Sequence, residues 1–348
     1  MSLAIDTDAA LSALRKRQGS GAFAPAVKTL RDLCADDLNH VDNELIDCLA
    51  SPVSMIPQLG GHLVKAGGKR LRPLLTLGVA AMHGYDGHNH IRLAAAVELI
   101  HGATLLHDDV VDKSSLRRGT STANVLWGNK ESVLVGDFIF SRSFELMVAT
   151  GDLEVLKILA HAAGVIAEGE VLQLGTQKNI DTDFDTYLAV IDAKTAALFA
   201  AAAEVGAVIS KAETSVIKAM RNYGRNLGIA YQLVDDALDY AGDEQALGKS
   251  VGDDFREGKM TLPIVYAISE ASRNEKDFWK RTIANGNRSN EDFNTAREII
   301  SRHGIIDKTL GTARTYAEIA LENLERAPQG PYSDAFAEIA RQSVERAF

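Results

Sequence analysis

Residues 94–112, AAAVELIHGATLLHDDVVD, join an almost wholly apolar run to a cluster of three aspartates. Residues 229–239, IAYQLVDDALD, repeat this arrangement. All seven prolines lie outside residues 74–262, where Ala and Leu are abundant. Proline-free sequence with apolar residues three and four positions apart is typical of long helices. We therefore predict an all-α fold.

The two aspartate clusters share the spacing DDxxD. They consist of Asp108, Asp109 and Asp112, and of Asp235, Asp236 and Asp239. Helix positions i and i+4 share one face, so each cluster presents two stacked carboxylates and a third beside them. One such cluster alone is typical of a solvated helix face, but two at the ends of apolar helices are costly unless paired or metal-bound. Carboxylates suit Mg²⁺, which takes its remaining ligands from phosphates, so the clusters indicate Mg²⁺-assisted departure of a diphosphate.

Three basic segments stand out against a net charge of −10. They are GGKRLRP at 67–73, with Lys69 and Arg72; Arg117-Arg118-Gly119; and the Gly-rich residues 248–259, with Lys249 and Lys259. Each alone is typical of an ordinary loop. Together with two metal-binding clusters they indicate two anionic substrates, one held through metal and one held directly by Arg and Lys. The acidic balance argues against nucleic acid as a partner.

The rest of the composition fits an ordinary globular protein of 348 residues, 46% hydrophobic and 24% charged. Cys34 and Cys48 lack metal-site spacing, so we expect inert thiols in a reducing compartment. The N-terminus has no apolar core of a signal peptide, and no apolar run is long enough to span a membrane. We expect a cytoplasmic protein without a transmembrane segment.

Glycine-containing breaks are expected to mark helix ends. They fall at 67–68, 84–87, 119, 151, 206, 242 and 248–258. About ten to thirteen helices fit between such breaks. No linker or low-complexity tract splits the chain, so we expect one domain over residues 1–348.

Five segments, in this order, resemble the trans-isoprenyl diphosphate synthase (polyprenyl synthetase) family. They are GGKRLRP, LIHGATLLHDDVVDKSSLRRGTSTAN, Lys194-Thr195-Ala196, YQLVDDALDY and GKSVGDDFREGKMTLP. The similarity is strongest to the long-chain bacterial enzymes, octaprenyl to decaprenyl diphosphate synthases, which make quinone side chains. Met260 departs from the family's GKPTLP pattern. The resemblance implies a helical bundle around a central cavity, with N-terminal helices in 1–50, a catalytic core in 60–270 and C-terminal helices in 271–348.

The resemblance also implies roles for the matching residues. Two or three Mg²⁺ ions, replaceable by Mn²⁺, would be bound by Asp108, Asp112 and Asp235 and would hold the allylic diphosphate. Asp109 and Asp236 would be catalytic residues of the same two clusters, and Asp239 would bind substrate. The allylic diphosphate would be assisted by Arg117, Lys194 and Lys259, and the path of its cation lined by Thr195 and Gln232. Isopentenyl diphosphate would be bound without metal by Lys69, Arg72, His101 and Arg118, with Lys249 as a further substrate-binding residue. From the residues alone, His101 could also be a core histidine and Lys194 a surface residue. Gln232 could be functional or structural, and His107 is interpreted as structural.

The implied reaction lengthens an allylic chain by one isopentenyl unit at a time, through ionisation, alkylation and proton loss. Ala103 and Thr104 lie five and four residues before Asp108, about one helical turn away. Shorter-chain relatives tend to have an aromatic residue there, so these small side chains predict an octaprenyl to decaprenyl (C40 to C50) product. The resemblance further implies a homodimer with transient membrane contact for product release.

Three other classes of protein share parts of this pattern. A class I terpene cyclase has a first aspartate cluster but needs no second diphosphate site, which the GGKRLRP segment would form. A noncatalytic partner subunit would be expected to lack one of the clusters. A Ca²⁺-binding helical protein would need EF-hand loop spacing, which is absent.

Overall fold

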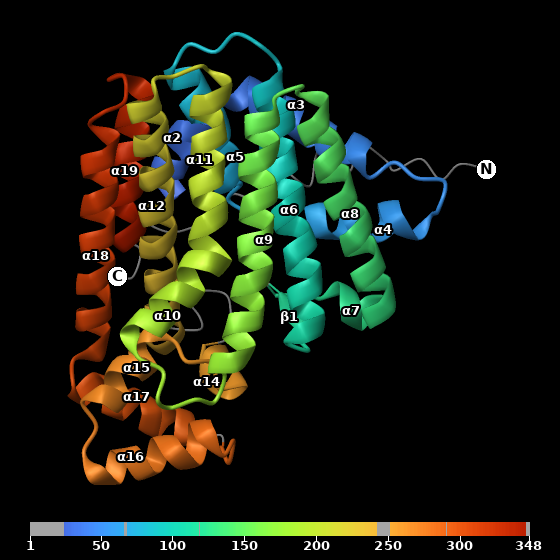
Figure 1. The fold of residues 1–348 in the computed structure, drawn as a ribbon. Helices are drawn as coiled ribbons and strands as arrows, with labels where there is room; N and C mark the ends of the chain where they lie inside the picture. Colours follow the sequence, from blue (N-terminus) through green and yellow to red (C-terminus); the bar gives the residue numbers. More distant parts are fainter. Residues whose placement is uncertain (1–23, 66–67, 118, 242–250, 290, 346–348) are drawn as a thin grey trace. The chain divides into compact units, whose positions relative to one another are not determined.

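A computed structural model describes residues 24–65, 68–117, 119–241, 251–289 and 291–345. The all-α prediction is confirmed (Figure 1). The helices up to the middle of the chain are α2 (Ala24–Leu33), α3 (Ala35–Cys48), α4 (Met55–Lys65), α5 (Leu71–Met82), α6 (Asn89–Val111), α7 (Ala123–Leu126), α8 (Asn129–Ala149) and α9 (Leu153–Thr176). They are followed by α10 (Phe184–Ile191), α11 (Ala197–Ile209), α12 (Thr214–Ala241), α14 (Asp253–Glu257), α15 (Leu262–Ser269), α16 (Arg273–Trp279), α17 (Asp292–Arg302), α18 (Ile305–Leu324) and α19 (Pro331–Glu345).

The described residues thus contain seventeen α-helices, together with two π-helical turns, η1 (Asp192–Ala196) and η2 (Lys280–Ala284). The expected ten to thirteen was too low because several helices are very short. The four residues of α7 and the five of α14 are examples. Glycines in the left-handed conformation, Gly252 (φ 80°) and Gly258 (φ 74°), flank α14, where other residues would be strained.

The chain divides into two compact units, and each is described by itself. Unit 1 comprises Met1–Ala163, Leu198–Gly224 and Asn323–Ile339. Unit 2 comprises Gly164–Ala197, Arg225–Glu322 and Ala340–Phe348. The single domain expected over residues 1–348 stays a prediction.

In unit 1, α6 runs beside α8, and α3 and α5 pack against α6 (Figure 1). Gly136 of α8 allows a close approach, because a Cβ there would lie 2.3 Å from Nε2 of His107. The same His107 nitrogen lies 3.2 Å from the carbonyl oxygen of Val133. These contacts place the His107 ring against α8, and its structural role stays a prediction.

Gly206 corrects one of the expected helix ends. It lies inside α11, where a Cβ would come within 2.7 Å of the carbonyl oxygen of Thr76. The Thr76 hydroxyl in turn donates to the carbonyl of Ala202, at 2.9 Å. Gly206 therefore permits tight packing of α11 on α5, a reason for glycine that a single sequence does not distinguish from a helix break.

Both cysteines are free thiols in unit 1. Burial raises the pKa of Cys34 to about 12 and that of Cys48 to about 11. Because the thiolate is the reactive form, the predicted inertness of both residues agrees with their surroundings.

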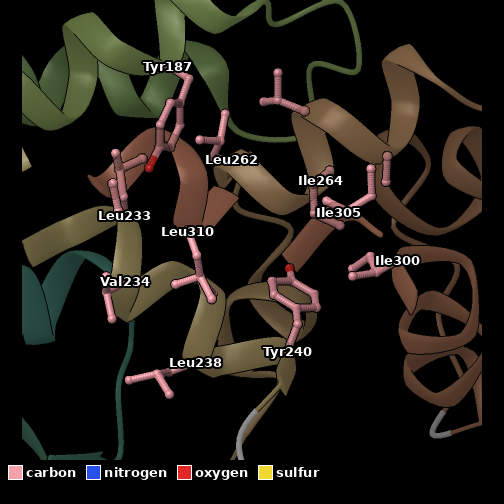
Figure 2. Close-up of a cluster of buried hydrophobic side chains, with 14 of the residues drawn as sticks. Tyr187, Leu233, Val234, Leu238, Tyr240, Leu262, Ile264, Ile300, Ile305 and Leu310 are labelled. Carbon is pink, nitrogen blue, oxygen red and sulfur yellow. The ribbon is translucent and has the colours of Figure 1, made fainter. Parts of the chain in front are cut away.

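Unit 2 has its own apolar core, shown in Figure 2. Leu233 and Leu238 of α12 pack there with Leu262 of α15 and Leu310 of α18. Tyr187 of α10 belongs to the same cluster. The core therefore fixes α12, which carries the second aspartate cluster, against α10 and α15. Helix α10 closely precedes Lys194 and Thr195, and α15 closely follows Lys259 and Met260.

Glu275 shows how charge stabilises this unit away from the candidate site. It is buried at the start of α16, where Oε2 accepts the Ser272 N–H at 2.8 Å. Its Oε1 lies 3.0 Å from Arg302 Nη1 and 3.1 Å from His303 Nε2. The hydrogen bonds from Ser272, with the nearby His303, lower the pKa of Glu275 to about 2.

Replacing Glu275 by Gln should lower the free energy of unfolding by about 1 kcal/mol at pH 7, because the amide lacks the negative charge that its partners stabilise. A lowered folded-state pKa stabilises the fold above the unfolded pKa of roughly 4.3, and this stabilisation disappears as the pH falls towards 2. Urea unfolding from pH 7 to pH 2 should therefore show the two proteins converging. Glu298→Gln, at an exposed position on α17, is the control; a Glu275→Gln deficit independent of pH would contradict the interpretation.

Within the described ranges, no helix combines the length and the apolar character needed to cross a membrane.

Candidate active site

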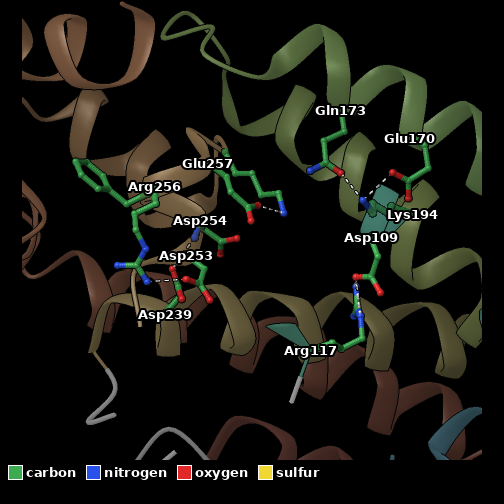
Figure 3. A network of polar contacts seen from close by, with 12 residues as sticks. Asp109, Arg117, Glu170, Gln173, Lys194, Asp239, Asp253, Asp254, Arg256 and Glu257 are labelled. Carbon is green, nitrogen blue, oxygen red and sulfur yellow. Dashed lines mark hydrogen bonds and ion pairs between the residues drawn. The ribbon is translucent and has the colours of Figure 1, made fainter. Parts of the chain in front are cut away.

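The first aspartate cluster closes α6. Asp108 and Asp112 are half-buried, and Asp112 caps the helix through its N–H, which donates to the carbonyl of Asp108 at 2.8 Å. Asp109 is buried, and its Oδ1 accepts Nε and Nη2 of Arg117 at 3.0 and 2.8 Å (Figure 3). The cluster therefore divides into Asp109, which holds Arg117, and a pair four positions apart.

A short hairpin that sequence reasoning missed positions Arg117. Strands β1 (Leu116–Arg117) and β2 (Thr120–Ser121) pair antiparallel, with Arg117 opposite Thr120. The Asn124 side chain donates to the carbonyls of Asp109 and Ser114, both at 3.1 Å. This amide ties the hairpin to the end of α6. Strands of two residues are too short to leave a periodic pattern in the sequence.

A cavity of about 40 Å³ in unit 1 brings two candidate residues together. His101 and Arg117 both line it, as do Arg70 and Glu98. Arg70 has a left-handed backbone (φ 51°) and pairs with Glu98 at 2.5 Å. This pair fixes the start of α5, which immediately follows Lys69.

The other two candidates of the GGKRLRP segment are also held by unit 1. Lys69 is half-buried, and its carbonyl accepts Nη2 of Arg31 at 3.3 Å. The guanidinium of Arg72 lies 4.5 Å from the ring centroid of Phe199, an arrangement that favours a cation. The candidates Arg118 and Lys249, and Gly67 of the same segment, lie outside the described residues.

The second cluster lies within α12, in unit 2. Asp235 is half-buried. Asp236 is buried and accepts the Tyr187 hydroxyl at 2.6 Å and the Gln232 amide at 2.8 Å. The Thr195 hydroxyl donates to Gln232 Oε1 at 3.0 Å. Thr195, Gln232, Asp236 and Tyr187 thus form one hydrogen-bonded chain.

Asp239 has a different task from its neighbours. Its Oδ1 accepts the Gly252 N–H at 3.0 Å, and its Oδ2 accepts the Asp254 N–H at 3.1 Å. These bonds fix the beginning of α14, which Figure 3 shows close to Asp239. Both carboxylate oxygens of Asp239 therefore accept hydrogen bonds from backbone N–H groups.

Lys194 lies in the π turn η1 and reaches two side chains of α9. Its Nζ is 2.7 Å from Oε2 of Glu170 and 2.7 Å from Oε1 of Gln173 (Figure 3). Lys259 pairs with Glu257 at 2.5 Å. Sequence reasoning missed Glu170 and Gln173, since only their place one turn apart on a helix facing Lys194 singles them out.

A cavity of about 140 Å³ in unit 2 collects these groups. It is lined by Lys194, Thr195, Gln232, Asp236 and Lys259, and by the unexpected Tyr187, Asp254 and Gln173. Burial raises the pKa of Asp236 to about 7, against the lowering effect of the hydrogen bonds from Tyr187 and Gln232. Burial, and then the nearby charge of Asp239, raise the pKa of Asp254 well above its usual range. The cavity thus combines two ammonium groups with buried carboxyls, a composition suited to an anion accompanied by cations.

The carboxylates of the two aspartate clusters suit a hard divalent cation in their chemistry. Among the described residues, no three or more His, Cys, Asp and Glu side chains form a group that could hold a metal ion alone. Mg²⁺ characteristically takes one or two carboxylates and completes its coordination with water and substrate phosphate. Asp108, Asp112 and Asp235 carry carboxylates of this kind, and their role as metal ligands stays a prediction.

The chain was compared with known proteins. Residues 53–300 match the family model for polyprenyl synthetase. The chain is 41% identical to octaprenyl diphosphate synthase of Escherichia coli over 320 residues, 92% of this chain and 99% of the relative.

Solved structures agree. A decaprenyl diphosphate synthase from Rhodobacter capsulatus is similar with a TM-score of 0.89 and 47% identity, covering 92% of this chain and 99% of that one. A polyprenyl synthase from Caulobacter crescentus, complexed with calcium and isoprenyl diphosphate, gives a TM-score of 0.90 and 48% identity, covering 96% and 100%. The resemblance inferred from the motifs is therefore confirmed: the chain belongs to the polyprenyl synthetase family, an enzyme family of prenyltransferases.

Proposed function

We propose that the protein is a long-chain all-trans polyprenyl diphosphate synthase, which condenses isopentenyl diphosphate head to tail with an allylic diphosphate. The observation that carries this proposal is its similarity, over more than nine tenths of the chain, to octaprenyl and decaprenyl diphosphate synthases. The product class is octaprenyl to decaprenyl, the length used in quinone side chains.

The reaction begins with heterolysis of the allylic C–O bond, whose electron pair leaves with the diphosphate. Lys194 and Lys259 line one cavity, where their ammonium groups stabilise the charge developing on the leaving group. In unit 1, Arg117, oriented by Asp109, provides a guanidinium for a substrate diphosphate. Divalent cations held by Asp108 and Asp112 in unit 1, and by Asp235 in unit 2, would neutralise further negative charge.

The allylic cation is then attacked by the double bond of isopentenyl diphosphate. A new C–C bond forms, and the tertiary cation loses a proton to give the new double bond, with the released diphosphate as acceptor. Thr195 and Gln232 line the same cavity, where their hydroxyl and amide oxygens would lie along the path of the cation. The protein thus acts mainly by positioning its substrates and complementing charge.

Isopentenyl diphosphate is assigned to unit 1. Lys69 precedes α5 and Arg72 lies in its first turn, and His101 lines the cavity that Arg117 also lines. Arg72 is preorganised by its contact with Phe199. Such direct recognition by guanidinium and ammonium groups requires no metal.

Chain length provides a specific prediction. Thr104 is half-buried and lies four positions before Asp108, so both share a helix face, whereas Ala103 is 1% exposed. Thr104→Phe should shorten the dominant product by one or more isopentenyl units at little cost in stability. Ala103→Phe should also shorten it, with a loss of about 1–3 kcal/mol from overpacking. Chromatography of dephosphorylated products measures both, and an unchanged distribution in both variants would disprove the assignment.

We further propose a homodimer with divalent-metal dependence in which Mg²⁺ is the physiological ion and Mn²⁺ can replace it. Apolar side chains exposed on α8, Leu134 (67%) and Val148 (62%), support a subunit interface. Sedimentation should show two chains per particle at micromolar concentration. A cytoplasmic location, with brief membrane contact when the apolar product leaves, belongs to the same proposal.

The function is tested by incubating the protein with farnesyl diphosphate, labelled isopentenyl diphosphate and Mg²⁺, with EDTA as control. A metal-dependent ladder ending at octaprenyl to decaprenyl is expected. Release of diphosphate without incorporation of isopentenyl units would instead indicate a cyclase. No reaction at all would indicate a subunit that requires a partner.

A further inference from the structure

The π turn η1 contains two of the candidate residues, Lys194 and Thr195. The Ala197 N–H donates to the carbonyl of Asp192, five residues earlier, which widens the helix by one residue. On an α-helix, consecutive side chains diverge by about 100°, yet Lys194 and Thr195 line the same cavity. Isolated π turns are uncommon, so contacts with other parts of the fold are needed to stabilise this one.

Asp192 and Arg225 form a two-pronged ion pair at the beginning of the turn. Arg225 Nε lies 2.7 Å from Oδ1 of Asp192, and Nη2 lies 2.7 Å from Oδ2. Parallel bonds of this kind fix geometry as well as supplying energy. The side chains are 41% and 32% exposed, so the pair contributes little to global stability and mainly sets the position of the turn.

The other faces of the turn are also fixed. Gly169 of α9 approaches closely, since a Cβ there would lie 2.8 Å from Cβ of Ala193 and 3.0 Å from the backbone nitrogen of Lys194. Gln232 contacts Thr195 and lies two turns after Arg225 on α12, on the same face. Helix α12 therefore contacts the turn at two points.

We propose that Asp192 and Arg225 are a positioning pair that holds η1 in its π conformation, so that Lys194 and Thr195 both face the allylic diphosphate. Neither residue of the pair is among those lining the cavity, so they act through the turn. The inference rests on the proposed function for the identity of the ligand.

Kinetics of Asp192→Asn and Arg225→Met test the proposal. Each should raise KM for farnesyl diphosphate, or lower kcat, by roughly tenfold or more, because small displacements of positioned groups are costly. KM for isopentenyl diphosphate should stay unchanged. The double variant should be no worse than the more impaired single variant, as expected for two residues that act as one unit.

Arg281→Met is the matched control. Arg281 also makes a two-pronged contact, through Nη1 and Nη2 with Asp292 at 2.9 and 2.6 Å, in unit 2 but away from the cavity lining. Because Asp292 is buried, Arg281→Met should lose at least as much thermal stability as Arg225→Met, with wild-type kinetics. Equal kinetic losses in Arg281→Met and Arg225→Met would show a structural effect only and overturn the proposal.

A crystal structure of Asp192→Asn gives a result independent of activity. We expect residues 192–196 to relax towards an α-helix and Lys194 to leave Glu170 and Gln173. A retained π turn would overturn the inference, whatever the kinetics. If the wild-type protein forms no prenyl product, the proposed function fails, and this structure alone decides the inference.

Discussion

Asp235→Asn is expected to lower kcat by roughly a thousandfold, the scale on which loss of one charge-stabilising group acts at a transition state. The residue is half-buried on α12, and we propose that it holds the divalent cation that neutralises the departing diphosphate. Asn keeps the shape of the side chain but not its charge, so the Mg²⁺ concentration for half-maximal rate should rise. The rate is measured with farnesyl and isopentenyl diphosphates over a Mg²⁺ titration.

Asp239→Asn is the informative comparison, because the motif alone treats the two aspartates alike. Both oxygens of Asp239 accept backbone N–H groups, and the amide can satisfy only one of them. We expect a loss of roughly 1–3 kcal/mol in the free energy of unfolding. Asp235→Asn, which keeps both of these backbone bonds, should lose less. A wild-type rate in Asp235→Asn would remove this residue from the proposed metal site.

Gly224→Ala should lower the free energy of unfolding by about 3 kcal/mol, at the upper end of overpacking costs. A Cβ at Gly224 of α12 would lie 2.3 Å from the carbonyl oxygen of Phe199 and 3.0 Å from Cα of Ala200. Both contacts are with the backbone of α11, which cannot move aside as a flexible side chain would. The loss outweighs the gain of up to about 1 kcal/mol in helix propensity that Ala normally brings. Urea unfolding measures it.

Gly311→Ala provides the control for this substitution. Gly311 lies within α18, and a Cβ there would meet no atom within 4 Å. The free energy of unfolding of the Gly311→Ala protein should rise by roughly 0.5–1 kcal/mol, the ordinary difference in helix propensity between Gly and Ala. Equal stabilities of the Gly224→Ala and Gly311→Ala proteins would mean that α11 and α12 are not packed as closely as described.

The helices and the chemical class of the candidate residues were predictable, because they depend on local pattern. Apolar runs before Asp108 and Asp235 predicted α6 and α12, and the motif order predicted the family. The separate tasks of the aspartates were not predictable. Asp236 accepts a hydrogen bond from Tyr187, and Asp239 accepts one from Gly252. Only folding brings these partners close to the aspartates.

The π turn and Gly206 illustrate the same limit. Nothing in the letters Asp192–Ala196 distinguishes a wide turn from an α-helical one, since the difference depends on Arg225 and Gly169 elsewhere in the chain. As a glycine, Gly206 is typical of a helix break, but in the structure it lies at a contact between two helices. The structural role of a residue could not be predicted from the sequence where that role depends on contact with a neighbouring helix.

The ion pair between Lys194 and Glu170 bears on how an enzyme that adds many units can keep turning over. Lys194 already has an anionic partner at 2.7 Å, so the diphosphate that we propose to bind there would share the ammonium group with a carboxylate. Glu170 would then compete with the diphosphate for the lysine at every cycle. This built-in competitor lowers affinity for the leaving diphosphate and so favours its departure before the next addition.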